Sequence, residues 1–255
     1  MTREPALVLV TGTGTGVGKT VATAALAACA GRAGRSVAVV KPVQTGVPDG
    51  LPGDAAEVAR LTGLPLGAVR EHLRLPEPLA PQAAAARAGV RLPPLAEHAQ
   101  RVRELAGDRD LVLVEGAGGL LVRLDSGGAT LADLGRMLRP LLRGVVVVVA
   151  AGLGALNHSE LTVEALAARD LPVLGLVIGS WPADPGPAEL GNLADLPRLC
   201  GVPLLGILPE GAGARDARAF TGSAPSWLAR PWGEADQPPR TPDPLPAPGR
   251  GTMVR

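Results

Sequence analysis

The sequence over residues 6–20 reads ALVLVTGTGTGVGKT, and this stretch decides the fold class of the 255-residue chain. Its first five residues form a short apolar run, which is typical of a buried strand, and a glycine-rich turn follows. A helix is predicted over residues 19–33. At such a junction the glycines let backbone N–H groups converge on phosphate oxygens, and the helix N-terminus adds a positive dipole end. The stretch therefore predicts a nucleotide phosphate site.

The spacing of the glycines departs from both standard nucleotide-binding patterns. Walker A places four residues between its first glycine and Gly-Lys, but that first position holds Thr13 here, and Gly12 leaves five. A dinucleotide G-x-G-x-x-G pattern needs a glycine where this chain has Val17 or Lys19. We interpret the stretch as a variant phosphate loop. In it Lys19 would reach the β- and γ-phosphates and Thr20 would bind Mg²⁺.

Further apolar runs recur along the chain, separated by segments with helical periodicity. They are mostly continuously apolar, as in strands buried on both faces of a parallel sheet. We therefore predict an α/β fold of the P-loop NTPase type, a doubly wound, mainly parallel sheet with helices on both faces. The predicted strands are 6–10, 36–41, 111–114, 145–150, 173–178 and 204–208, and the predicted helices are 19–33, 54–61, 81–88, 95–105, 131–138, 159–169 and 189–200.

The end of the chain differs from the rest. Residues 1–220 are predicted to form one P-loop domain, whereas residues 221–255 include PPRTPDPLPAP, lack hydrophobic periodicity and are predicted to be a disordered tail. The net charge of +1 indicates no binding surface for nucleic acid or an anionic membrane. The longest apolar run, residues 144–156, is too short to span a bilayer. Residues 1–10 lead directly into the glycine-rich motif without a signal-peptide pattern, so we expect a cytoplasmic protein.

Only two of the 25 basic residues are lysines, Lys19 and Lys41. With 34 glycines, 26 prolines and no tyrosine, this indicates a GC-rich coding bias that replaces lysine by arginine where the protein tolerates it. Lysine is a compact donor and arginine a planar fork, so the two retained lysines are candidates for functional positions. Lys41 ends the second predicted strand, where it would bind a transferred phosphoryl group or an anionic substrate. The alternative is a solvated loop cation.

Two acids stand at positions suited to a metal. Glu115 follows the apolar run LVLV and opens a glycine-rich segment, which is typical of a Walker-B-like metal ligand, with a solvated acid as the alternative. Asp54 stands at a predicted helix start, where it would bind metal or cap the helix. Together with Thr20, these acids would offer oxygen ligands to a Mg²⁺ ion that keeps its other positions for water and phosphate.

Four other reactive side chains receive no role. Cys29 and Cys200 lie in helical patterns, and two cysteines in a chain of this length do not make a disulfide framework. His72 and His98 lie in weakly patterned stretches.

Four sequence motifs together resemble those of the dethiobiotin synthetase family. They are VTGTGTGVGKT, KPVQTG, EGAGGLLVRL and GLGALNHSELT, and the resemblance runs from Leu7 to about Pro209. It implies a Mg²⁺- and ATP-dependent carboxylation and ring closure of 7,8-diaminopelargonic acid with CO₂. The products would be dethiobiotin, ADP and phosphate, formed by way of a carbamate and a carbamic–phosphoric mixed anhydride. The resemblance also implies that residues 1–220 are a synthetase domain and that the active site lies at a homodimer interface.

The resemblance assigns roles residue by residue. Lys19 and Lys41 would be catalytic and stabilise the phosphoryl group and the carbamate, and the metal ligands would be Thr20, Asp54 and Glu115. Substrate would be bound by Thr15, Lys41, Thr45, Pro78, Gly118, Gly154 and Asn157, the last two reaching the substrate of the partner subunit. The nucleotide would be bound by Gly14, Thr15, Gly16, Val17, Gly18, Lys19, Thr20, Val21, Glu115, Gly179, Pro209 and Glu210. For Asn157, a helix cap is the other interpretation.

One position departs from the family pattern. Well-known members carry an asparagine that reads the adenine edge where this chain has Gly179, which lacks a side-chain amide. This predicts weak base selectivity, so that other nucleoside triphosphates support turnover besides ATP. Two other functions stay open, a regulatory P-loop ATPase of the MinD/ParA type and a nonhydrolysing nucleotide sensor. Many MinD/ParA proteins carry a second lysine early in the loop, where this chain has Gly14.

Overall fold

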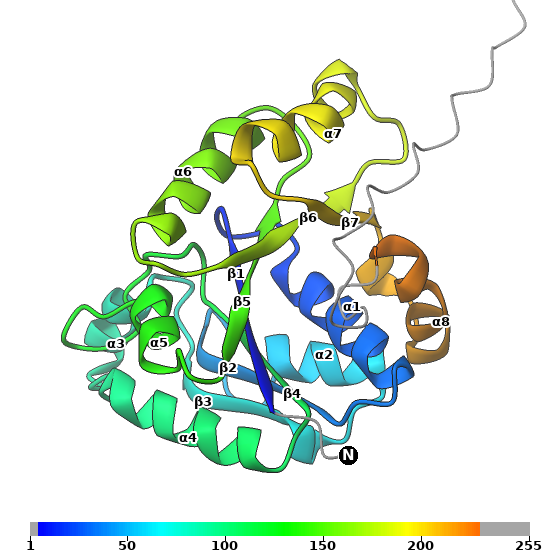
Figure 1. Cartoon of the computed structure of the whole chain (residues 1–255). Helices are drawn as coiled ribbons and strands as arrows, with labels where there is room; N and C mark the ends of the chain where they lie inside the picture. Colours follow the sequence, from blue (N-terminus) through cyan, green and yellow to red (C-terminus); the bar gives the residue numbers. More distant parts are fainter. Residues whose placement is uncertain (1–4, 230–255) are drawn as a thin grey trace, which may run out of the picture.

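A seven-stranded sheet forms the centre of the computed structural model, which describes residues 5–229 (Figure 1). The strand order is β3-β2-β4-β1-β5-β6-β7, and all neighbouring strands pair in parallel. The chain leaves β1 toward β2 and leaves β5 toward β6, so the strand order reverses near the middle of the sheet. Such a reversal opens a crevice at the carboxyl ends of the strands, where ligands bind in this class of fold. The strands are β1 (Ala6–Gly12), β2 (Val37–Thr45), β3 (Val69–Leu75), β4 (Leu111–Glu115), β5 (Leu142–Val149), β6 (Val173–Trp181) and β7 (Leu204–Pro209).

Helices cover both faces of the sheet, as predicted. Successive side chains of a strand point to opposite faces, so Leu7 and Leu9 of β1 join one apolar cluster while Val8 and Val10 join the other. The first cluster includes residues of α3 (Pro81–Ala88), α4 (Leu95–Gly107), α5 (Leu131–Met137), α6 (Ala155–Ala167) and α7 (Pro187–Cys200). The second includes residues of α1 (Lys19–Arg32), α2 (Asp54–Thr62) and α8 (Ala217–Trp227), which lie together in Figure 1. Short 3₁₀ turns occur at Leu66–Ala68 and Ala212–Ala214.

The six predicted strands and seven predicted helices are all present, but one strand and one α-helix within residues 5–229 were not predicted. The first is β3, which forms one edge of the sheet. The second is α8, which crosses position 221, so the prediction that a disordered tail begins there is wrong. Phe220 and Ala224 of this helix are fully buried, and the backbone of Ala229 donates to Leu205 O of β7 at 2.7 Å. The proline-rich stretch PPRTPDPLPAP lies outside the described residues. No helix within residues 5–229 is long and apolar enough to cross a membrane.

Candidate active site

The phosphate loop joins β1 to α1 and takes its shape from glycines. Gly16 and Gly18 have φ angles of 77° and 91°, which favour glycine, and Gly18 caps α1. Lys19 is the first residue of the helix, is only 7% exposed and donates from Nζ to Gly14 O at 2.7 Å. The lysine thus folds back over the loop, at the helix end that favours anions.

Lys41 lies buried in β2 and contacts residues from two other elements. Its Nζ lies 2.5 Å from Asp54 Oδ2 and 2.8 Å from Glu115 Oε1, and it donates to Gly116 O at 3.0 Å. Asp54 is the first residue of α2, and Glu115 is the last residue of β4. The helix cap is Gly53 and not Asp54, so the interpretation of Asp54 as a cap is wrong, and its carboxylate instead pairs with Lys41.

Thr20 links this cluster to the phosphate loop. Its Oγ1 donates to Glu115 Oε1 at 3.0 Å, the same oxygen that Lys41 contacts. A hydroxyl and two carboxylates therefore gather around one ammonium group, where Glu115 ends β4 and Lys41 lies in the middle of β2. Among residues 5–229 there is no group of three His, Cys, Asp or Glu side chains able to hold a metal. A set of two carboxylates and a hydroxyl nevertheless fits Mg²⁺, which needs few protein ligands when phosphate and water supply the rest.

The electrostatics of the Lys41 cluster favour a charged ammonium. Burial alone would lower the pKa of Lys41, but the charges and hydrogen bonds of Glu115 and Asp54 outweigh burial and raise this pKa. The cluster is therefore an ion triad in which Lys41 and Glu115 are buried, Asp54 is partly exposed, and two carboxylates face one ammonium.

Apart from Lys41, the predicted substrate residues fall into three places. Thr15 and Gly118 are close, because a Cβ atom on Gly118 would lie 3.5 Å from Thr15 Oγ1. Thr45 ends β2, and the next residue, Gly46, packs on Pro78, whose Cα would lie 3.2 Å from a Cβ atom there. The other two predicted residues lie on a separate element and are described next.

Gly154 and Asn157 lie at the start of α6. Gly154 caps this helix, so the interpretation of Asn157 as the cap is wrong, since Asn157 lies inside the first turn. Within residues 5–229 no hydrogen bond joins Asn157 to the Lys41 cluster. The neighbouring Leu153 is 92% exposed.

The predicted nucleotide residues that follow Glu115 in the sequence lie on β6 and at the end of β7, which pack against the phosphate loop and the start of α1. Gly179 of β6 packs against the loop backbone, since a Cβ atom on Gly18 would lie 2.5 Å from Gly179 O. The backbone N–H of Glu210, just after Pro209, donates to Trp181 O of β6 at 2.7 Å. A Cβ atom on Gly213 would lie 3.1 Å from Val21 Cγ2, so the segment after β7 reaches the first turn of α1.

Sequence reasoning missed the side chains that hold Asp54 in place. Gln44 Oε1 accepts a hydrogen bond from the Asp54 backbone N–H at 2.9 Å, and Arg74 of β3 contacts the loop before Asp54. Gln44 lies within the quoted word KPVQTG, but nothing local marks its partner. Arg74 lies in the strand that was not predicted.

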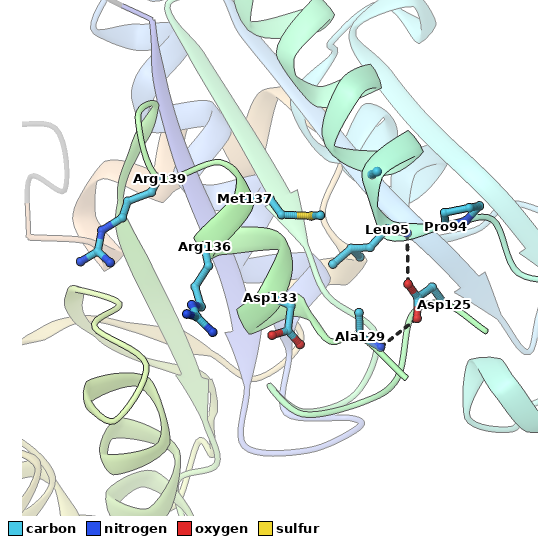
Figure 2. Close-up of a pocket in the computed structure, with 9 residues that line it drawn as sticks. Pro94, Leu95, Asp125, Ala129, Asp133, Arg136, Met137 and Arg139 are labelled. Carbon is cyan, nitrogen blue, oxygen red and sulfur yellow. Dashed lines mark hydrogen bonds between the residues drawn. The ribbon is translucent and has the colours of Figure 1, made fainter. Parts of the chain in front are cut away.

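A separate surface hollow lies between the start of α4 and α5 (Figure 2). Its volume is about 710 Å³, and none of the predicted site residues lines it. The carboxylate of Asp125 in its wall accepts from the backbone N–H groups of Leu95 at 3.1 Å and Ala129 at 2.8 Å, which Figure 2 marks with dashed lines. This acid therefore supports the local chain, and the hollow is not part of the candidate site.

The chain is similar to known proteins over most of its length. A family model described as an AAA domain matches residues 7–216. The ATP-dependent dethiobiotin synthetase BioD of Rhodococcus jostii is 54% identical over 226 residues, covering 89% of this chain and 96% of that protein. The protein of the same name from Frankia casuarinae is 59% identical over 205 residues, covering 80% of this chain and 84% of that protein.

A solved structure supports the fold alone. The cell division ATPase MinD of Pyrococcus furiosus aligns with a TM-score of 0.52 and 20% identity, over 86% of this chain and 97% of that chain. This likeness confirms the P-loop α/β architecture, and the far higher identity to the synthetases does not favour the MinD-type alternative. The chain belongs to the family of ATP-dependent dethiobiotin synthetases.

Proposed function

We propose that the chain makes dethiobiotin from 7,8-diaminopelargonic acid, CO₂ and ATP. In the first step one amine adds to CO₂ and loses a proton, which gives a carbamate. A carbamate oxygen then takes the γ-phosphoryl group and ADP leaves. The second amine attacks the carbonyl carbon of this mixed anhydride, loses a proton and expels phosphate as the ureido ring closes. The observation that carries the proposal is the meeting of Lys41, Glu115 and Thr20 at the phosphate-loop end of the sheet.

The protein must hold two anions, a carbamate and a triphosphate, against each other. Lys19 at the start of α1 supports the β- and γ-phosphates, and the loop N–H groups add to its effect. Lys41 offsets charge on the carbamate and on the phosphoryl group in transfer, while Thr15, Thr45, Pro78 and Gly118 hold the diamine. This chemistry depends on positioning and charge, and needs no nucleophile from the protein.

Mg²⁺ is the implied cofactor. Thr20, Asp54 and Glu115 would hold it, and the bound ion would offset the negative charge of the triphosphate. These acids also hold Lys41, so the same pair of carboxylates serves both the metal and the ammonium.

We also propose a homodimer in which Gly154 and Asn157 reach the substrate of the partner subunit. The exposed Leu153, just before α6, and the 56% exposed Leu161, in the middle of α6, support a surface that a partner subunit would cover. Sedimentation analysis is expected to give a dimer. Mixing a Lys41→Ala chain with an Asn157→Ala chain is expected to restore some activity, because one of the two sites in a mixed dimer is then intact. A monomer that turns over substrate would contradict this part of the proposal.

The function itself is tested by product detection. Purified protein is incubated with 7,8-diaminopelargonic acid, bicarbonate, Mg²⁺ and ATP, and dethiobiotin is measured by mass spectrometry. We expect dethiobiotin and ADP in equal amounts. ATP hydrolysis without dethiobiotin at high enzyme concentration would contradict the proposal and support a nucleotide switch instead.

A further inference from the structure

The loop between β2 and α2 carries Asp54 to Lys41 but is itself mostly exposed. Its sequence, GVPDGLPG over residues 46–53, is rich in glycine and proline, and residues 48–52 are exposed. Asp54 follows directly, and its carboxylate lies 2.5 Å from Lys41 Nζ. A short, exposed connection of this kind has many accessible conformations, so the position of Asp54 needs support from outside the loop.

Gln44 provides the first support. It is only 4% exposed, its Oε1 accepts from the Asp54 N–H at 2.9 Å, and its Nε2 donates to Thr45 O at 3.0 Å. The first N–H groups of a helix have no partner within the helix, so this side chain satisfies a group that would otherwise be unpaired. The buried amide thus ties the end of β2 to the start of α2.

Arg74 provides the second support, from the edge strand β3. Its Nη1 donates to Leu51 O at 2.5 Å and to Pro48 O at 3.3 Å, both in the exposed loop. Its Nε and Nη2 donate to Glu71 Oε2 at 2.9 and 2.6 Å. One guanidinium therefore binds an acid on one side and two loop carbonyls on the other, which a lysine cannot do.

The register of the sheet places these groups beside the cluster. Lys41 pairs with Glu71 and Gln44 pairs with Arg74 across β2 and β3. The side chains of Gln44, Glu71 and Arg74 also converge on Gly53. A Cβ atom on Gly53 would lie 3.0 Å from both Arg74 Nη2 and Gln44 Oε1, and closer still to Glu71 Oε1. The residue just before Asp54 is therefore enclosed by the same three side chains.

We propose that Gln44, Glu71 and Arg74 are positioning residues that fix the Asp54 carboxylate against Lys41. They act through the loop and touch neither substrate nor nucleotide. The inference rests on the proposed function for its kinetic consequence alone, since the position of Lys41 is measurable without turnover. Misplacing a catalytic group by about 1 Å can cost on the order of 100-fold in rate, so this support matters to the reaction.

Because the chain has only two lysines, the position of Lys41 can be followed directly. Lysine-selective ¹⁵N labelling gives only two side-chain ammonium signals, from Lys19 and Lys41. In Arg74→Met and Gln44→Met we expect the Lys41 signal to shift or broaden while the Lys19 signal keeps its position. Arg74→Lys, which keeps the charge but loses the fork, should shift the Lys41 signal in the same direction by less. Gln44→Glu, which keeps an acceptor for the Asp54 N–H, should lie nearer to the wild-type spectrum than Gln44→Met.

A matched control comes from α7. Arg198 pairs with Asp195 three residues earlier at 2.7 Å, as Arg74 does with Glu71. Unlike Arg74 it is exposed, and within residues 5–229 it makes no hydrogen bond to a loop carbonyl. Arg198→Met should leave both lysine signals and the turnover unchanged. A Lys41 signal that stays in place in folded Arg74→Met and Gln44→Met, or that moves equally in Arg198→Met, would overturn the inference.

The kinetic arm separates positioning from general stability. We expect kcat to fall about 10-fold or more in Arg74→Met and Gln44→Met, with the KM for nucleotide changed less than about 3-fold. Gln44→Glu should recover part of kcat. A uniform loss of kcat in Arg74→Met, Arg74→Lys, Gln44→Met and Gln44→Glu, with no recovery in Gln44→Glu, would contradict a positioning role. If the wild-type protein forms no dethiobiotin, the proposed function fails, and the lysine signals still decide whether these residues hold Lys41.

Discussion

The two lysines of the chain are nearly equally buried but are held in opposite ways. Lys19 is 7% exposed and Lys41 4% exposed. Lys19 makes one hydrogen bond, to a carbonyl five residues earlier, whereas Lys41 contacts two carboxylates and a carbonyl from distant parts of the chain. Burial and the nearby charge of Lys41 lower the pKa of Lys19, and the opposing charges of Glu115 and Asp54 do not restore it. Burial also acts to lower the pKa of Lys41, but there Glu115 and Asp54 outweigh burial and raise it.

The difference separates two ways of building a charged site. The phosphate loop places Lys19 by local backbone geometry and, within residues 5–229, gives it no directly bonded acid, which suits a residue that would meet a triphosphate. The Lys41 cluster offsets its charge with acids that are themselves positioned by β3 and the loop before α2. The first region thus depends on a short sequence, and the second depends on the assembled sheet.

The largest expected effect is on turnover, through Lys41→Arg. A planar fork cannot replace a point donor that lies within 3.0 Å of Asp54, Glu115 and Gly116 O. We expect kcat to fall about 10²- to 10³-fold, while the dissociation constant for nucleotide changes less than about 3-fold. Lys19→Arg should instead weaken nucleotide binding and turnover together. Steady-state kinetics and calorimetric titration distinguish these patterns, and wild-type turnover in Lys41→Arg would remove Lys41 from the chemistry.

The next effect is on the stability of the protein without nucleotide. Substituting Lys41 should change the free energy of unfolding by a different amount from substituting Lys19. Lys41→Met leaves the nearly fully buried Glu115 without its counter-charge, so we expect a loss of about 3 kcal/mol in the free energy of unfolding. Lys19→Met removes a desolvated charge with one neutral partner, so we expect a change of less than about 1 kcal/mol. Urea unfolding measures both values.

A second substitution checks the cause of this difference. Adding Glu115→Gln to Lys41→Met removes the unpaired charge and should recover part of the lost stability. Equal destabilisation by both lysine substitutions would show that the charge balance does not distinguish the two regions.

The contrast between local sequence and the assembled sheet also explains how much of the fold could be predicted from the sequence. The continuous apolar runs are local signals, and the six strands they predict are present. The missed strand β3 reads VREHLRL, in which polar residues break the apolar run. It lies at the sheet edge, and only its first and last residues are buried. Its identity as a strand depends on pairing with β2, which no local pattern shows.

The missed helix α8 has a tertiary cause as well. Its sequence contains Gly222 and Pro225, which disfavour helix, and it adjoins a proline-rich segment. Contacts compensate, since Phe220 packs edge-to-face on Trp227 at 5.3 Å and the Arg215 guanidinium lies 5.2 Å from the Trp227 ring centre. A composition-based boundary at residue 221 therefore fell too early.

The residues of the candidate site could be predicted from the sequence, but the side chains that position them could not. Lys19 and Asp54 start helices and Glu115 ends β4, so their positions follow from local patterns. Lys41 was predicted to end its strand, but β2 continues to Thr45 and Lys41 lies in its middle. The hydrogen bond from Asp54 to Gln44 spans only ten residues, but it depends on how the intervening loop folds.

A pair of histidines, buried His98 and partly buried His72, tests the same balance of burial against counter-charge. His72 and His98 stack with their Nδ1 atoms 2.9 Å apart. Burial lowers the pKa of His72 to about 4, and the nearby charges of His98 and Arg101 contribute to this shift. Burial and Arg101 also lower the pKa of His98, although Glu97 and Asp125 oppose the shift. Unlike Lys41, this pair lacks a directly bonded acid among the described residues, so it favours the neutral form.

The expected result is a loss of stability in acid. The folded-state pKa of His72 lies below the unfolded value of about 6.5, so the unfolded chain binds more protons, and stability falls as the pH drops from about 6.5 toward 4. Between pH 6.5 and 4.5 the wild type should lose on the order of 1 kcal/mol more than His72→Gln. Urea unfolding across this pH range checks it. Parallel pH profiles for the two proteins would show that the stacked pair does not titrate on unfolding.

The smallest expected effect concerns selectivity for the base of the nucleotide, and it depends on how Gly179 packs against the phosphate loop. Gly179 lies so close to the loop that a Cβ atom there would overlap Val17 O and lie 2.8 Å from Val148 Cγ1. No side chain at this position can read a base, so the kcat/KM values for ATP, CTP and GTP should lie within about 10-fold, or about 1.4 kcal/mol. An asparagine-bearing relative should show a wider range under the same conditions. Gly179→Asn should weaken all three nucleotides alike, because it displaces the phosphate loop without adding a base contact. A strong preference for ATP alone in the wild type would mean that another group reads the base, and a selective gain for ATP in Gly179→Asn would mean that the loop can yield to a side chain.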